Sequence, residues 1–94
     1  MGCAEYLEYY VGEKDSISGY VLPKTAGETV VINSGKYELK REITEEVVTS
    51  GSCEVDGCNF EAMLQFTEEG SFIFEVTLII GDMVEIEKIP VKVR

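Results

Sequence analysis

The chain contains no histidine and no tryptophan. Without histidine it cannot form a Ser-His-Asp or Cys-His nucleophilic system, and it offers no imidazole to a metal ion. Basic residues are also scarce, since 8 lysines and arginines stand against 18 aspartates and glutamates, for a formal charge of −10. A surface of this sign repels nucleic-acid phosphates and anionic lipid headgroups. We therefore expect neither nucleic acid nor membrane as a partner.

Long apolar runs and targeting signals are missing as well. No run approaches the roughly 18 apolar residues of a membrane-spanning helix, and the first residues lack the basic flank and apolar core of a signal peptide. The chain begins like a myristoylation site, but Tyr6 stands where that motif has serine or threonine. The spacing of Cys3, Cys53 and Cys58 fits neither a zinc site nor a redox pair. These features predict reduced thiols and a protein kept in the cytoplasm, or in an assembly built there.

The pattern that is present is that of β-strands. Hydrophobic residues make up 45% of the chain and alternate with polar ones over short runs, whereas no stretch keeps a helical period. We expect strands at about Ala4–Val11, Ser16–Leu22, Glu28–Ile32, Lys36–Ile43, Val47–Val55, Cys58–Phe66, Ser71–Ile80 and Val84–Val93. The 94 residues fit a single domain, 1–94. Seven or eight strands predict an all-β fold, an antiparallel two-sheet immunoglobulin-like sandwich, with a small β-barrel as the alternative.

Two hairpins can be predicted in detail. Asp56-Gly57 is typical of a two-residue type I′ loop, which would pair Val55 with Cys58. This hairpin would place six residues on one inward face: Cys53, Val55, Cys58, Phe60, Ala62 and Leu64.

The second hairpin joins the last two strands. A two-residue loop of Gly81 and Asp82 would set Glu85 and Glu87 on the core side. We therefore expect a three-residue loop ending at Met83 and a bulge near Glu87, with Pro90 limiting pairing on one side.

No group of residues has the pattern of a catalytic, cofactor or metal site. Carboxylates are plentiful, but acidic residues at alternating strand positions are typical of a solvated face. No loop has the ligand spacing of a calcium site or the glycine spacing of a phosphate cradle. We therefore expect no enzyme activity and no cofactor.

The first strand offers a candidate interface instead. Strand alternation puts Tyr6 and Tyr10 together on one face, and a solvated tyrosine pair is typical of protein interfaces. Glu8 and Glu13 lie beside them and would favour a basic partner. Tyr6, Glu8, Tyr10 and Glu13 are the interface candidates.

From Val11 to the end, the sequence resembles the small immunoglobulin-like structural proteins and domains of tailed bacteriophages and prophages. The resemblance is carried by the segments 11–19 (VGEKDSISG), 32–39 (INSGKYEL), 48–57 (VTSGSCEVDG), 70–77 (GSFIFEVT), 79–82 (IIGD) and 89–93 (IPVKV). It implies a virion component of the head, neck, tail or baseplate, assembled in the bacterial cytoplasm. It supplies no catalytic residues. The chain departs from the common pattern at Leu22–Glu28, where the phage proteins have a DxxGxPxDLTG stretch.

Two functions from different classes follow. The first is a non-enzymatic virion protein that docks onto other virion proteins, in many copies, with self-association left open. The alternative is a bacterial immunoglobulin-like module for protein interaction or carbohydrate adhesion. An enzyme inhibitor would need a long exposed loop, for which Leu22–Glu28 is the candidate.

Overall fold

The computed structural model describes residues 6–23 and 27–94. The predictions for Cys3 and for the start of the first strand lie outside this part, as does the middle of the segment Leu22–Glu28. The described residues form eight strands: β1 (Leu7–Tyr9), β2 (Lys14–Tyr20), β3 (Ser34–Arg41), β4 (Val47–Ser52), β5 (Glu54–Asp56), β6 (Asn59–Gln65), β7 (Gly70–Ile80) and β8 (Met83–Val93).

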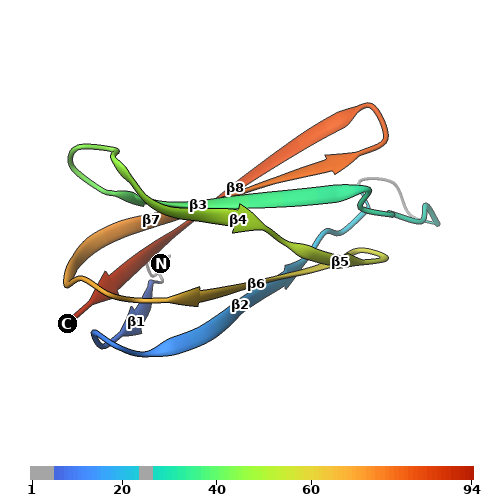
Figure 1. Cartoon of the computed structure of the whole chain (residues 1–94). Coiled ribbons are helices and arrows are strands. Elements are labelled where there is room, and N and C mark those ends of the chain that lie inside the picture. Colours follow the sequence, from blue (N-terminus) through green and yellow to red (C-terminus); the bar gives the residue numbers. More distant parts are fainter. Residues whose placement is uncertain (1–5, 24–26) are drawn as a thin grey trace, which may run out of the picture.

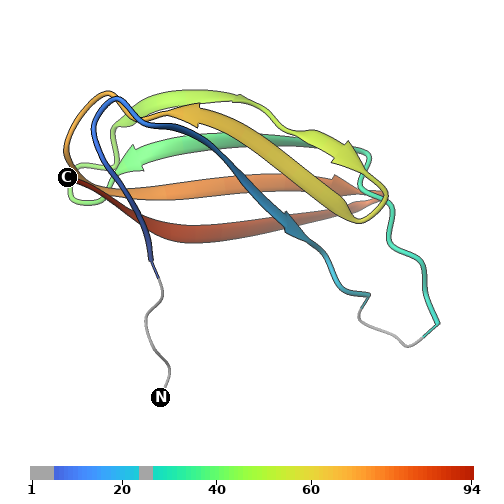
Figure 2. The same cartoon turned by 90° about the horizontal axis from the view of Figure 1, so that it is seen from below.

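The strands form two sheets packed face to face (Figures 1 and 2). One sheet has the order β1-β8-β7-β3-β4 and the other has the order β2-β6-β5. In immunoglobulin terms, β2, β6 and β5 take the places of strands B, E and D, while β8, β7, β3 and β4 take those of G, F, C and C′. No strand pairing within the described residues joins the two sheets, so the fold is a sandwich rather than a closed barrel. The predicted fold class is confirmed.

One strand departs from the antiparallel pattern. β1 runs parallel to the end of β8, with Leu7 opposite Val91 and Tyr9 opposite Val93. It ends at Tyr9 rather than at the expected Val11, because the chain turns at residues 10–13 to enter the other sheet. The N-terminal strand thus belongs to the five-stranded sheet.

The core is built around β7, the middle strand of the five-stranded sheet. Phe72, Phe74, Val76 and Leu78 alternate along it and are all buried. They face a second apolar row on the three-stranded sheet, in which Ala62 and Leu64 are also buried. No polar side chain is buried among the described residues, so the interior is held by apolar packing alone.

The chain changes sheets at two places where the sequence predicts continuous strands. The predicted strand Val47–Val55 is split at Cys53, because β4 pairs with β3 whereas β5 pairs with β6. The predicted strand Glu28–Ile32 is absent. Ile32 donates its N–H to Gly57 in one sheet and Asn33 donates to Ile79 in the other, so this segment crosses the sandwich without pairing along either sheet. Ile32 is buried all the same.

The β5–β6 hairpin has a different loop from the one predicted. Asp56 pairs with Asn59 and Val55 with Phe60, so the loop residues are Gly57 and Cys58. Gly57 has a φ of 61°, and glycine with positive φ at the first loop position is the signature of a type II′ turn. The partner of Val55 differs by two positions from the prediction, which leaves Val55, Phe60, Ala62 and Leu64 on the predicted inward face. Cys58 lies in the turn instead, and Cys53 lies between β4 and β5.

The β7–β8 loop was also predicted wrongly. Ile80 pairs with Met83, so the loop is Gly81 and Asp82, and the register runs without a bulge to Gly70 opposite Val93. Glu85 and Glu87 therefore share the inward side with Leu78. Burial of charge does not follow, because β1 pairs with β8 only at positions 91–93, so Glu87 lies on the outermost strand of the described sheet at this level and stays exposed.

The central role of β7 predicts a large effect for a truncation within it. Leu78→Ala should lower the free energy of unfolding by about 2–5 kcal/mol, because a side chain with no exposed surface leaves a cavity. Leu22→Ala is the matched control, since Leu22 is 70% exposed and should change stability by less than about 0.5 kcal/mol. Chemical denaturation measures both, and equal effects would contradict this description of the core.

Candidate protein interface

The structure brings three of the four interface candidates onto the outer face of the five-stranded sheet. Tyr6 and Tyr10 flank β1 and are 50% and 64% exposed, and Glu8 lies between them on the same face. Alternation along the strand turns Leu7 and Tyr9 inward instead.

Two charged residues at the end of the chain contact the outer face of β1. Arg94 donates from Nε to the carboxylate of Glu8, and this hydrogen bond raises the pKa of Arg94. The ammonium group of Lys92 lies 5.5 Å from the centroid of the Tyr6 ring, within cation–π range. Lys92 of the neighbouring strand β8 therefore orients the exposed ring of Tyr6.

The fourth candidate, Glu13, shapes the turn rather than the face. Its Oε1 accepts a hydrogen bond from the N–H of Tyr10 at 3.0 Å, and its own N–H donates to the Tyr10 carbonyl at 3.0 Å. Gly12 supplies the positive φ of 95° that the turn requires. Glu13 therefore holds Tyr10 in place at the point where the chain leaves β1.

The inward side of β1 anchors the same segment. The rings of Tyr9 and Phe66 stack at 4.1 Å with 16° between their planes. Burial and the nearby Asp15 carboxylate raise the pKa of Tyr9. A short strand with its inner tyrosine stacked in the core is a rigid platform for the exposed pair.

A ladder of charges crosses the middle of the same outer face. Lys40 Nζ donates to Glu75 Oε1 at 2.8 Å, and Lys88 Nζ lies 3.7 Å from Glu75 Oε2 on the other side. The hydrogen bond from Lys40 lowers the pKa of Glu75 and, in turn, raises the pKa of Lys40. The ladder links β3, β7 and β8 across this face.

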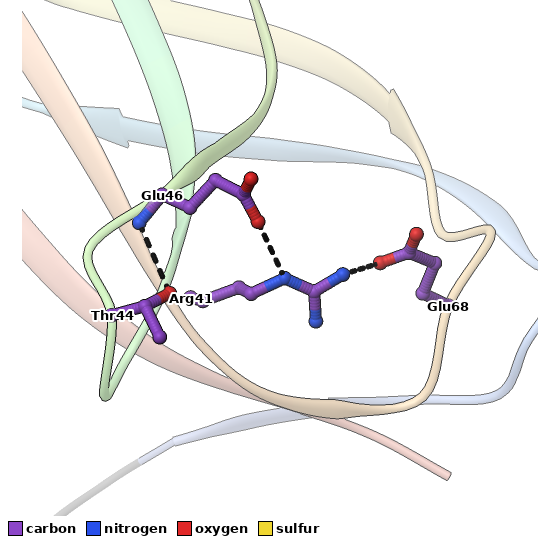
Figure 3. A network of polar contacts seen from close by, with 4 residues as sticks. All are labelled: Arg41, Thr44, Glu46 and Glu68. Atoms are coloured by element: carbon purple, nitrogen blue, oxygen red, sulfur yellow. Dashed lines mark hydrogen bonds and ion pairs between the residues drawn. The ribbon is translucent and has the colours of Figure 1, made fainter.

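A second polar network, which sequence reasoning missed, lies at the end of the sandwich (Figure 3). Arg41 reaches Glu46 at 3.1 Å in its own loop and also donates to Glu68 in the β6–β7 turn. The Thr44 hydroxyl accepts from the N–H of Glu46. Since Arg41 and Glu68 lie far apart in the sequence, no local pattern could have found this contact.

The loop held by Arg41 has an unusual backbone. Glu45 has a φ of 62°, a conformation that costs free energy in residues other than glycine. Ile43, at the tip of the loop, is 92% exposed.

The outer face of the three-stranded sheet carries an open hollow of about 620 Å³. Its rim includes the 65% exposed ring of Tyr20. Glu54 and Glu61 sit directly opposite each other across β5 and β6, where like charges repel. This face is acidic, in contrast to the outer face of the five-stranded sheet with its lysines.

Residues 6–23 and 27–94 hold no group of three or more cysteine, aspartate or glutamate side chains placed to bind a metal ion. Nor does this part contain a helix long and apolar enough to cross a membrane. Cys53 and Cys58 are free thiols, as predicted. Burial raises the pKa of the Cys53 thiol, which makes it a weak nucleophile at neutral pH.

Comparison with known proteins supports the fold but assigns the chain to no protein family. No protein-family model matches the chain, and no curated protein matches its sequence. Among solved structures, the chain is similar to the crystal structure of an engineered protein, with a TM-score of 0.70 and 14% sequence identity. The match covers 95% of this chain and 18% of the engineered protein.

The positive φ of Glu45 yields a stability prediction. Glu45→Gly should raise the free energy of unfolding by about 0.5–1 kcal/mol, because glycine adopts this conformation without steric cost. Glu42→Gly in the same loop is the matched control and should destabilise the protein. Chemical denaturation of both variants is the check, and destabilisation by both would show that Glu45 is not strained.

The Lys40–Glu75 contact yields a pH prediction. The pKa of Glu75 is lower in the folded than in the unfolded chain, so its stabilising effect is present near neutral pH and is lost as pH falls through the folded pKa. Glu75→Gln should therefore lower the melting temperature at pH 7, and the difference should shrink below about pH 4. Thermal denaturation from pH 7 to 3 measures this, with the exposed Glu69→Gln as control. A difference that is constant with pH would contradict the assignment.

Proposed function

We propose that the chain is a non-catalytic, immunoglobulin-like protein of a bacteriophage particle that works by docking onto other virion proteins. The observation that carries the docking role is the surface around Tyr6 and Tyr10, where two exposed aromatic rings stand on one rigid sheet face. Tyrosine supplies a large contact area at a small cost in conformational entropy. The phage context is supported by the resemblance of the sequence from Val11 onward.

The ionic contacts suit such a role. The contacts of Glu8 and Lys92 orient the surface before a partner arrives, which reduces the entropy lost on binding. In a particle with repeated subunits a weak contact per copy is sufficient, since linked sites raise the effective concentration. The chain would be assembled in the bacterial cytoplasm and would act within the particle.

Co-purification with phage particles tests this function. Phage particles from cells that carry the gene, purified by density gradient, should contain the chain, as detected by mass spectrometry. A chain found only outside the particles contradicts the proposal.

Variants connect the particle to the tyrosine surface. The double variant Tyr6→Ala, Tyr10→Ala should reduce incorporation at least about tenfold, which corresponds to about 1.4 kcal/mol of binding. Tyr20→Ala is the matched control, because Tyr20 is exposed to the same degree on the opposite sheet. Melting temperatures should change little for both, and equal incorporation would exclude this surface.

A second candidate function is carbohydrate binding, which the hollow on the three-stranded sheet favours. Its rim combines the Tyr20 ring with the polar side chains of Glu54, Asp56 and Asn59. An aromatic face beside hydrogen-bonding groups can hold a sugar ring. Retention of a glycan by the wild-type chain but not by Tyr20→Ala, with Tyr10→Ala unaffected, would favour this function over virion docking.

A further inference from the structure

The outer edge of β4 presents unpaired backbone groups. β4 is the last strand of the five-stranded sheet, and no strand of the described residues lies beside it on the side away from β3. Cys53 donates its N–H to the Gly35 carbonyl of β3 at 2.9 Å. Because backbone groups alternate in direction along a strand, Ser50 and Ser52 turn their N–H and C=O groups away from β3. These groups are a template for the addition of another strand.

The segments outside the described residues join the sandwich elsewhere. Tyr6 lies over Lys92 of β8, at the opposite edge of the sheet. Five residues span at most about 18 Å, whereas five strand spacings, about 24 Å, separate β1 from a strand beyond β4. Leu22 and Glu28 border a hollow with Met83, next to the β7–β8 turn. The open edge of β4 is therefore a property of the described fold.

β4 has little of the protection that sheet edges usually carry. Charged residues and proline on an edge strand, or a bulge within it, commonly prevent pairing with another chain. The six residues of β4, VVTSGS, include no charge and no proline. The bulge in its pairing falls between Leu39 and Lys40 of β3, and the register from Thr49 to Ser52 is regular. The edge strand β8, in contrast, carries several charges and Pro90.

A second copy of the chain fits this edge. Antiparallel pairing of two β4 strands about Gly51 sets Ser50 of each copy opposite Ser52 of the other. Both serines direct their backbone groups toward the partner, so the two serine pairs form four N–H to C=O hydrogen bonds. Gly51 lies opposite itself, and no charged side chains meet between the two β4 strands.

The charges of β3 select this register. Lys36 is level with Ser52 and Glu38 is level with Ser50, and cross-strand partners share the outer face. With the centre at Gly51, Lys36 of one copy is level with Glu38 of the other, at a distance of three strand spacings or about 14 Å between backbones. Only serines lie between them, so the two long side chains can lean toward each other. A centre at Ser50 or Ser52 sets Glu38 level with Glu38, or Lys36 level with Lys36.

We propose that β4 joins two copies of the chain into a symmetric dimer, in which the two β4 strands pair antiparallel about Gly51. The two five-stranded sheets become continuous, and the level of Lys36 and Glu38 occurs twice because the contact is two-fold symmetric. Opposite charges at these levels fix the register, and backbone hydrogen bonds hold the strands. The proposal goes beyond the docking function and does not depend on it.

The oligomeric state of the full chain tests the dimer. Sedimentation velocity at about 0.15 M salt, which screens the repulsion between two copies of charge −10, should show a monomer–dimer equilibrium. Hydrogen exchange followed by NMR should slow at least about threefold at the amides of Ser50 and Ser52 as the dimer forms. Absence of a dimer at about 1 mM chain, or a dimer that leaves both amides unchanged, would overturn the proposal.

Charge variants test the register. Lys36→Glu and Glu38→Lys should each weaken dimerisation at least about fivefold, because each sets like charges level. An equimolar mixture of the two variants should dimerise at least as well as the wild-type chain, since every level then holds opposite charges. Lys14→Glu is the matched control on the exposed start of β2 and should leave dimerisation unchanged. Equal effects of Lys36→Glu and Lys14→Glu, or no recovery in the mixture, would exclude this register.

A proline variant tests the backbone pairing itself. Ser50→Pro removes an N–H that points toward the second copy and none that bonds to β3, and edge strands tolerate proline in such places. Dimerisation should weaken at least about tenfold, while the melting temperature of the dilute monomer changes little. A folded Ser50→Pro variant that dimerises like the wild-type chain would exclude the β4 edge.

Discussion

Four alternating residues on β7 form the constraint on which the rest of the structure depends. Phe72, Phe74, Val76 and Leu78 are buried against the three-stranded sheet, and this burial fixes which side of β7 faces inward. The pairing registers of the neighbouring strands β3 and β8 follow from this, because a shift of one residue would move every side chain of a strand to the opposite face. Thus Leu39 on β3 and Val91 on β8 are buried, and Lys40 and Lys92 point outward.

The exposed surfaces are also set by this constraint. The outer face of the five-stranded sheet carries the exposed tyrosines, the Lys40–Glu75–Lys88 ladder and the exposed Val84 and Ile86 of β8. The outer face of the three-stranded sheet is acidic and hollow. The two outer faces of the sandwich thus differ in chemistry.

The fold could be predicted from the sequence because alternation is a strong signal wherever one side of a strand is buried. The inward positions of the β5–β6 hairpin, including Val55 and Phe60, were placed correctly although the loop was wrong, since a shift by two residues preserves the face. The β8 prediction failed for a related reason. It assumed that both strands of the hairpin are equally buried, whereas Val76 on the middle strand β7 is buried and Glu87, its neighbour on the outer strand β8, remains solvated.

The exposure of Tyr6 and Tyr10 was also within reach of sequence reasoning, whereas the contacts of this surface were not. The partners of Glu8 and Tyr6 come from the opposite end of the chain, because β1 runs parallel to β8. The strain at Glu45 carries no sequence signal, since glutamate is an ordinary residue in a loop. The apolar residues of segment 28–32 predict a strand. Only the tertiary structure shows that this segment crosses between the sheets.

Measuring the register of β7 on β8 is the most direct test, because the register decides which side chains of the two strands face inward and which are exposed. In antiparallel sheets the Cα atoms of non-hydrogen-bonded pairs lie closest, so their Hα protons give strong nuclear Overhauser effects. We expect such effects between Ile79 and Val84 and between Thr77 and Ile86. Effects between Ile80 and Val84 and between Leu78 and Ile86 would contradict this register.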